Sequence, residues 1–487
     1  MFRKHMLVAI LISCMVIVVS SCVSAAQPVP PSVPKEADPG FAGDWIGTLD
    51  IGMSIRIVFI IKLNPQAPSG YEGYCLSPDQ SSAQFPISSI ELDGTSLAIS
   101  VASVDARYQG SFFGPDTITG KFLQGSVSLP LTLQRKEWKI AKRPQDPVAP
   151  FPYRDEEVTV PRGSFSLAGT LSLPDDTKLA DATMRFPAVI LISGSGLQNR
   201  DEEILNHRPF LVLADSLARK GIAVLRLDDR GTGESTGDPS MATTLDFAAD
   251  TLAAVNYLKT RADIDPARIG LCGHSEGGLI AFILAAEHPS DIAFIVSMAG
   301  PGMKGDELLV LQGKLIAKAE GVPESEIQQN TDIQRKLLSI VKEHASDDNC
   351  TAMNEEARSL LASAGVATDA IESALAEINA PWMRWFVACD PAVYIAQLRC
   401  PVLALNGELD LQVPFAQNLK IIREQLAAAD NTRSLVRSYP GLNHLFQHAK
   451  TGSPSEYGSI EETIAEQVLL DIQDWIVRNA PGQAKKP

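Results

Sequence analysis

The sequence predicts an α/β protein with a mostly parallel sheet covered by helices on both faces, preceded by a small antiparallel β barrel or sandwich. From Phe41 to about Arg135, apolar and polar residues alternate with a period of two, which is typical of strands with one buried face. Beyond about residue 155, short apolar runs alternate with amphipathic segments, which predicts parallel strands joined by crossover helices. With 487 residues, the chain is long enough for both parts.

The N-terminus predicts an exported protein. Arg3 and Lys4 precede a mainly apolar run from Leu7 to Val19, which is short for a membrane-spanning helix and typical of a signal peptide. The following Val19-Ser20-Ser21-Cys22 looks like a bacterial lipobox, so we expect residues 1–26 to be a signal peptide and Cys22 to be lipidated. The mature chain would then be a periplasm-facing outer-membrane or cell-surface lipoprotein. Ordinary cleavage near Ser24-Ala25-Ala26 is the alternative, and would give a periplasmic or secreted protein.

Proline-rich stretches and changes of hydrophobic rhythm divide the rest of the chain. Six to eight antiparallel strands are predicted in the first part. A large residue, a spacer and a glycine, such as Tyr108-Gln109-Gly110, recur at four places near the beginnings of strands, and we expect these glycines to permit bends or bulges. The predicted parts are a tether (27–40), a β domain (41–137), a linker (138–155), the α/β domain (156–480) and a tail (481–487).

Charge and cysteine usage narrow the function. With 42 Lys+Arg against 58 Asp+Glu, the net charge of −16 makes nucleic acid or an anionic membrane face a poor partner, and leaves the lipid anchor as the expected membrane contact. No CxxC or Cys/His ligand spacing occurs, so we expect no metal. A disulfide between Cys350 and Cys389 is possible. The sequence leaves the oligomeric state open.

In the α/β domain, a long helical insertion interrupts the alternation of strands and helices. No strand is visible between Pro301 and about Asp390, and helically spaced apolar residues predict an insertion over residues 303–390, where a lid would lie. Its aromatic residues, including Trp382 and Trp385, either line a substrate pocket or seat the lid. The predicted strands are 188–192, 223–227, 268–272, 292–298, 402–405 and 434–439, with a hairpin at 158–173 and helices at 209–220, 245–260 and 278–287.

One motif points directly to chemistry. Gly273-His274-Ser275-Glu276-Gly277 follows the apolar strand 268–272 and opens a helix, which is the context of a G-x-S-x-G nucleophile elbow. Ser275 is therefore the candidate nucleophile. His274 lies within the turn, where we expect it to serve packing.

A serine nucleophile needs a base, and the base needs an orienting acid. Asp410 and His444 lie on loops after the last two predicted strands, and the chain order Ser, Asp, His is that of a hydrolase triad. Glu408 competes for the acid role and His448 for the base role. We prefer Asp410, which lies deeper in its loop, and His444, which directly follows its strand.

The site also needs two N–H groups to stabilise an oxyanion. The backbone N–H of Glu276, next to Ser275, is the first candidate. The second should come from the loop Ser193-Gly194-Ser195-Gly196-Leu197 after strand 188–192, where we favour the N–H of Ser195, with Gly196 second. This loop lacks the third glycine of a dinucleotide-binding GxGxxG motif, and we expect no cofactor.

Over about residues 155–480 the chain resembles secreted bacterial α/β-hydrolase esterases, close to the serine aminopeptidase-like hydrolases. The N-terminal β domain also looks like the domain that precedes such enzymes. The resemblance implies an α/β-hydrolase fold with an eight-stranded sheet, a Ser-Asp-His triad, no metal and carboxylic-ester substrates. It also suggests that 228–231 is a structural loop. The motifs that carry it are 193–202 (SGSGLQNRDE), 207–235, 272–278 (CGHSEGG), 406–414 (NGELDLQVP) and 441–446 (GLNHLF).

The sequence therefore predicts a serine carboxylesterase that hydrolyses small-molecule esters through an acyl-enzyme. One alternative is a serine peptidase or aminopeptidase on the same fold, which would need an acidic anchor for the substrate amine, such as Glu307 or Glu324. The other alternative is a surface-anchored binding protein with a vestigial hydrolase domain.

Overall fold

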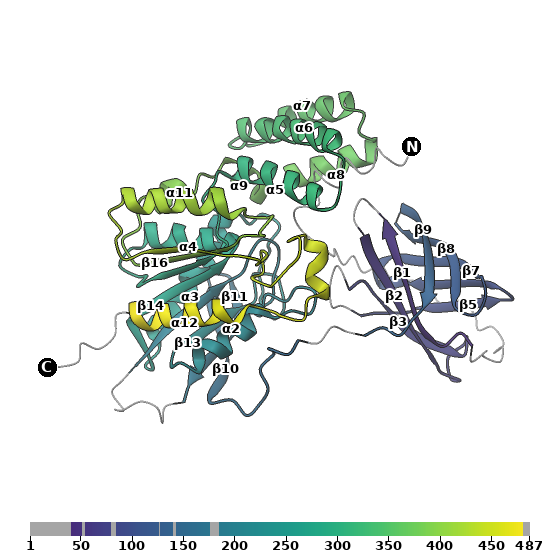
Figure 1. The fold of residues 1–487 in the computed structure, drawn as a ribbon, viewed down its shortest axis with the longest axis horizontal. Coiled ribbons are helices and arrows are strands. Elements are labelled where there is room, and N and C mark those ends of the chain that lie inside the picture. The colour runs from purple at the N-terminus through teal and green to yellow at the C-terminus, as the bar shows by residue number, and fades with distance from the viewer. Residues whose placement is uncertain are drawn as a thin grey trace. The chain divides into compact units, whose positions relative to one another are not determined.

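The computed structural model describes residues 40–50, 54–78, 84–125, 127–139, 143–175 and 185–480. The predicted signal peptide with Cys22, the tether up to residue 39 and the tail 481–487 lie outside these residues. The chain forms two compact units that divide between residues 142 and 143, inside the predicted linker (Figure 1).

In the N-terminal unit, nine described strands form one antiparallel sheet in the order β4-β3-β2-β1-β9-β8-β7-β6-β5, more than the six to eight predicted. Strands β4 and β5 lie at opposite edges of this order, yet only two residues separate them in the chain. The three Cα–Cα steps from Pro86 to Ser89 span at most about 11 Å, so the sheet curls until its edges approach, as in a barrel and not a sandwich. The strands are β1 Gly43–Asp50, β2 Ser54–Leu63, β3 Tyr71–Leu76, β4 Phe85–Pro86, β5 Ser89–Asp93, β6 Ser96–Val101, β7 Ala106–Phe112, β8 Thr117–Gln124 and β9 Val127–Arg135.

The repeated glycines permit close strand approach where we expected bends or bulges. The register continues through Gly73 opposite Ile61 and through Gly120 opposite Gly110. A Cβ at Gly73 would lie 2.0 Å from the Ile60 carbonyl oxygen, and one at Gly120 would lie 2.1 Å from that of Gln109. Only glycine fits at such contacts.

The C-terminal unit is built on an eight-stranded sheet in the order β10-β11-β13-β12-β14-β15-β16-β17. The pairs β10–β11 and β11–β13 are antiparallel, and the remaining pairs are parallel. Strand β10 begins at Tyr153, inside the predicted linker. The strands are β10 Tyr153–Arg162, β11 Phe165–Pro174, β12 Phe186–Ile192, β13 Ala223–Leu227, β14 Ile264–His274, β15 Ile295–Met298, β16 Val402–Gly407 and β17 Leu435–Tyr439.

Helices cover both faces of this sheet (Figure 1). One apolar cluster joins α3, α4 and α11 to one face, and a second joins α2 and α12 to the other. Burial on both faces explains why β12 is continuously apolar and why every residue of β15 is buried. The covering helices are α2 Pro209–Ala218, α3 Thr244–Thr260, α4 Glu276–Glu287, α10 Ala392–Ile395, α11 Phe415–Ala428 and α12 Glu466–Asn479.

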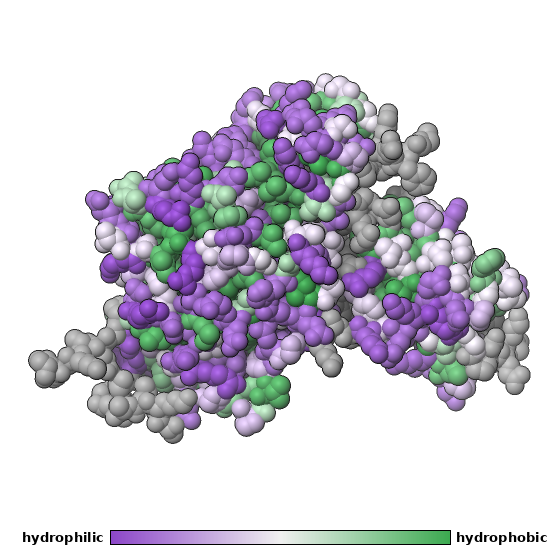
Figure 2. Space-filling view, in the orientation of Figure 1, coloured by the Kyte–Doolittle hydropathy of each residue, from purple (hydrophilic) through white to green (hydrophobic). Residues whose placement is uncertain are grey.

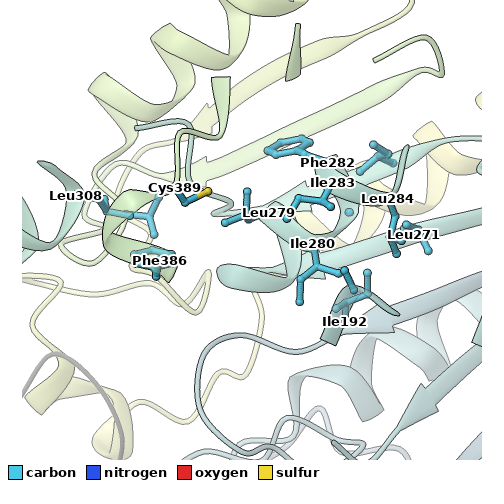
Figure 3. Close-up of a cluster of buried hydrophobic side chains, with 14 of the residues drawn as sticks. Ile192, Leu271, Leu279, Ile280, Phe282, Ile283, Leu284, Leu308, Phe386 and Cys389 are labelled. Atoms are coloured by element: carbon cyan, nitrogen blue, oxygen red, sulfur yellow. The ribbon is translucent and has the colours of Figure 1, made fainter. Parts of the chain in front are cut away.

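The predicted helical insertion is present between β15 and β16. Figure 3 shows its Leu308, Phe386 and Cys389 continuing the apolar cluster that Leu279 and its neighbours form on α4. The insertion is therefore seated on the helix that follows Ser275. Its helices are α5 Gly305–Ala319, α6 Glu324–Glu343, α7 Thr351–Ser363, α8 Thr368–Ile378 and α9 Pro381–Ala388.

The cysteines and the surface add two findings. All five described cysteines are free thiols, so Cys350 and Cys389, whose pairing the sequence left possible, do not form a disulfide. Figure 2 shows hydrophilic residues spread over the face in view, with apolar ones in small groups. Within the described ranges, none of the helices is both long and apolar enough to span a bilayer.

A tyrosine in the N-terminal unit tests its packing. The buried Tyr108 hydroxyl lies 3.1 Å from the Ile118 carbonyl oxygen and 3.2 Å from that of Leu131, so it donates within β8 and β9. We expect Tyr108→Phe to lower the stability of this unit by about 1–2 kcal/mol, because it removes a buried donor. Calorimetry should show an earlier transition for the N-terminal unit and an unchanged one for the C-terminal unit. Two unchanged transitions would contradict this.

Candidate active site

Ser275 lies in a strained turn between β14 and α4. Its φ of 55° and ψ of −120° place it in a backbone conformation that non-glycine residues rarely adopt. A Cβ at Gly273 would lie 2.0 Å from the Gly277 carbonyl oxygen, and one at Gly277 would lie 2.0 Å from that of Ile192. Both glycines are therefore required for α4 to pass so close to β12.

Asp410 and His444 are in contact on the loops after β16 and β17. Asp410 Oδ2 lies 2.8 Å from His444 Nδ1, and both side chains are buried. Asp410 Oδ1 accepts the backbone N–H groups of Gln412 and Val413, each at 2.8 Å. Three donors thus converge on one carboxylate. The contact with Asp410 holds a proton on His444 Nδ1 and leaves Nε2 as the basic nitrogen.

The competing residues lie elsewhere. Glu408 Oε1 accepts the hydroxyl of Ser438 at 2.8 Å. The His448 side chain is 70% exposed and pairs with Glu462, 2.8 Å away. The structure thus brings Asp410, and not Glu408, to His444.

His274 connects the Ser275 turn to the His444 loop. Its Nε2 donates to the His444 carbonyl oxygen at 3.0 Å, and the two rings lie 4.7 Å apart. Its Nδ1 is 3.0 Å from Glu202 Oε1. Burial disfavours the imidazolium, but the charge and hydrogen bond of Glu202 outweigh it and raise the pKa of His274. His274 therefore bridges two parts of the site, beyond the packing role that we expected.

Acidic side chains hold the loop of residues 193–198, here called the β12 loop. Glu202 Oε1 accepts the Gly194 N–H at 2.7 Å. Asp229 accepts the Ser193 hydroxyl at 3.0 Å and the Gln198 N–H at 2.8 Å. Burial raises the pKa of Asp229 to about 8. At neutral pH this carboxyl is mostly protonated, which limits the negative charge near the loop.

The β12 loop also lies directly against Ser275. A Cβ built on Gly194 would be 3.1 Å from the Ser275 Cβ. Because the Gly194 N–H is already bonded to Glu202, Ser195 stays the first candidate donor of this loop, with Gly196 second. Glu276 begins α4, where helix geometry leaves the backbone N–H without a partner inside the helix.

Several side-chain contacts that shape this site were not predicted, although Trp382 and the Glu276 N–H had been singled out. The Glu276 carboxylate accepts Thr244 Oγ1 at 2.6 Å and the indole N–H of Trp382 at 2.7 Å. Trp382 belongs to α9, so the insertion reaches the residue that follows Ser275. Glu202 is the last residue of motif 193–202, which was its only signal. No spacing in the sequence predicts these contacts between distant segments.

A buried polar network supports the His444 loop. His207 Nδ1 is 3.1 Å from Thr463 Oγ1, and its Nε2 is 3.0 Å from both the Tyr457 carbonyl oxygen and Gln447 Nε2. Asn443 Oδ1 accepts the Gln447 N–H at 2.9 Å. These contacts tie the segment beyond His444 to the start of α2 and to the C-terminal region.

The buried His207 predicts acid sensitivity. Burial lowers the pKa of His207 from 6.5 to about 4. Between pH 6.5 and 4, His207 therefore binds a proton in the unfolded chain but not in the folded one. Its contribution to the free energy of unfolding is fully present above pH 6.5 and is lost as the pH falls to 4. The loss should reach roughly 3 kcal/mol. Urea unfolding from pH 4.5 to 7.5 should give a shallower pH slope for His207→Gln than for wild type. Parallel slopes would contradict the assignment.

Known proteins resemble this chain mainly over the C-terminal unit. Residues 208–449 match the family model described as serine aminopeptidase, S33. Esterase EstD of Thermotoga maritima is 27% identical over 374 residues, 74% of this chain and 79% of that protein. The putative esterase NocK of Nocardia uniformis is 32% identical over 120 residues, 23% of this chain and 33% of that protein. The Pyrococcus furiosus esterase structure shares 15% identity at a TM-score of 0.40, over 71% of this chain and 100% of that one.

Proposed function

Because the chain belongs to an α/β-hydrolase family that contains esterases, we propose that it is a serine carboxylesterase with Ser275, His444 and Asp410 as its triad. The observation that carries this proposal is the buried 2.8 Å hydrogen bond between Asp410 and His444. The ring of His274, next to Ser275, lies against that of the same histidine, with centroids 4.7 Å apart and planes tilted by 46°. A serine in a strained turn and an oriented imidazole are the parts that acyl transfer requires.

In the proposed acylation, Ser275 Oγ attacks the ester carbonyl carbon while His444 Nε2 takes the hydroxyl proton. Asp410 keeps the ring oriented and stabilises the imidazolium. The N–H groups of Glu276 and Ser195 bind the oxyanion of the tetrahedral intermediate. Collapse of this intermediate breaks the bond to the alcohol oxygen, and His444 protonates the departing alkoxide.

Deacylation repeats these steps with water. His444 takes a proton from the water, whose oxygen attacks the acyl carbon, and then returns a proton to Ser275 Oγ as the acid leaves. Each proton moves between the reacting oxygen and His444, so this route uses no metal or cofactor.

We favour esters over peptides as substrates because two similar proteins, EstD and NocK, are named as an esterase and a putative esterase. An aminopeptidase needs an acidic side chain at the site for the substrate amine, and both sequence candidates, Glu307 and Glu324, are exposed. Parallel assays on p-nitrophenyl acetate and an aminoacyl-p-nitroanilide separate the two activities. A fluorophosphonate probe that fails to label the protein would favour the binding-protein alternative.

Substitution of Ser275 tests the nucleophile. We expect Ser275→Ala to lower kcat on p-nitrophenyl acetate by about 10⁴–10⁶-fold with an unchanged circular dichroism spectrum. Asp410→Asn should also lose about 10⁴-fold, because the amide favours the wrong tautomer of His444. Glu408→Gln is the matched control and should keep its activity. A Ser275→Ala protein with a tenth of wild-type activity would sink the assignment.

We further propose that the chain is exported and lipidated at Cys22, on the strength of its N-terminal sequence alone. Wild-type protein should then partition into detergent, because the acyl chains are attached at Cys22. Cys22→Ser should shift it to the aqueous phase or leave it unprocessed. A fully aqueous wild-type protein with a mature N-terminus near Ala26 would instead mean simple secretion.

A further inference from the structure

The Glu276 carboxylate is a shared acceptor for three separate parts of the C-terminal unit. Its Oε1 accepts the Thr244 hydroxyl at 2.6 Å, at the start of α3, and the Trp382 indole N–H at 2.7 Å, from α9. The Ser195 hydroxyl of the β12 loop also hydrogen-bonds to this carboxylate. The insertion, a sheet-covering helix and the candidate oxyanion loop thus meet at one side chain.

This carboxylate depends on its donors. Glu276 is 4% exposed, and the hydroxyl and indole groups that donate to it are neutral. Burial raises the pKa of Glu276, and the three hydrogen bonds oppose that rise. Losing one donor leaves a buried carboxylate under-solvated, so the remaining groups must rearrange.

The Trp382 end of this network is fixed to the body of the insertion. Its ring stacks on that of Phe386, with centroids 5.0 Å apart and planes at 13°. Phe386 is buried in the cluster that includes Leu308 and Leu279, as Figure 3 shows. The place of α9 on α4 therefore determines where the indole N–H lies.

The Ser195 end is the least constrained part of the β12 loop. Ser195 stands between Gly194 and Gly196, and Gly196 has a φ of +93°. Glu202 holds Gly194, and Asp229 holds Ser193 and Gln198, on either side of Ser195. The Ser195 hydroxyl contacts the Glu276 carboxylate, and this contact constrains Ser195 between those two anchored ends.

We propose that Glu276 is a positioning residue that couples the helical insertion to the oxyanion hole through Trp382 and Ser195. When the insertion is seated, Trp382 and Ser195 share the carboxylate and the Ser195 N–H points to the reacting carbonyl. When the insertion lifts, the carboxylate loses one donor and Ser195 shifts. The kinetic consequence rests on the proposed function, whereas the structural coupling does not.

A double-mutant cycle tests the kinetic consequence. Trp382→Phe keeps an aromatic ring on Phe386 and removes the N–H, and Ser195→Ala removes the hydroxyl. Because removing an oxyanion donor outright costs about 10²–10³-fold in kcat, we expect misplacing one to cost about 10-fold in each variant, with little change in KM. Both substitutions interrupt the same connection through Glu276. The double variant should therefore lose no more kcat than the single variant with the larger loss. Losses that multiply would overturn the coupling.

Two further variants separate positioning from packing. Glu276→Gln keeps Oε1 for Trp382 and Thr244 and offers an N–H to the Ser195 oxygen, so it should retain most of kcat, whereas Glu276→Ala should not. Trp475→Phe makes the same substitution in the apolar cluster on the other face of the sheet. It should lower stability and leave kcat unchanged. Equal kcat losses in Trp475→Phe and Trp382→Phe would mean that Trp382 only packs.

Hydrogen–deuterium exchange tests the coupling without any activity. Trp382→Phe should speed exchange in peptides that cover residues 193–198, and Trp475→Phe should not. Unchanged protection of this loop in Trp382→Phe would overturn the inference even in an active esterase. A wild-type protein without esterase activity, but with this exchange response, would defeat the proposed function and keep the coupling.

Discussion

The close approach of α4 to the end of β12 is the constraint on which the rest of the site depends. With Gly277 against the Ile192 carbonyl oxygen, the turn is forced into the strained conformation of Ser275. The side chains of His274 and Glu276, on either side of Ser275, contact different segments of the unit. One bonds to Glu202 and the His444 backbone, and the other to Thr244 and Trp382. This one backbone contact therefore determines the positions of Ser275, the His444 loop and the insertion relative to one another.

Burial changes the charge of the acidic groups at this site, so their number alone does not give its net charge. Three carboxyl groups surround the β12 loop, a poor environment for a developing oxyanion if all were ionised. Burial raises the pKa of Asp229 to about 8, and Glu202 faces a His274 whose pKa is raised. The net negative charge at the loop is therefore smaller than the residue count suggests. Acidic side chains can then fix backbone N–H groups without repelling the charge that those groups stabilise.

The sequence predicted what depends on local pattern and missed what depends on distant contacts. The fold class is confirmed, and strands such as β12 and β13 lie where continuous apolar runs placed them. Within the predicted insertion, the sequence did not indicate α7 as a separate helix, because its buried residues make a weak apolar stripe. These residues are Met353, Ala357 and Leu361. The Trp382–Glu276 contact joins residues 106 positions apart, which no periodicity encodes.

Whether Cys350 and Cys389 pair could not be predicted for the same reason. Pairing two cysteines from composition assumes that their segments meet, yet Cys389 lies in the apolar cluster at the foot of α9. Cys350 precedes α7, where its sulfur accepts an N–H of Arg384 at 3.4 Å. By contrast, the choice of Asp410 over Glu408 was argued from depth in the loop. That reasoning agrees with where the two carboxylates lie. Asp410 is deep enough in its loop to accept hydrogen bonds from the backbone N–H groups of Gln412 and Val413.

The interior of the N-terminal unit limits what that unit can do. Closed β structures hold a ligand only where the lumen is wide enough to stay unfilled. Here Trp45, Phe59 and Tyr108 are all 0% exposed and fill the interior. The Tyr108 hydroxyl already bonds to two backbone carbonyl oxygens, so it has little remaining capacity to bind a ligand. Glycines such as Gly73 and Gly120 draw neighbouring strands closer still. Any recognition by this unit would therefore use its outer face or its strand ends.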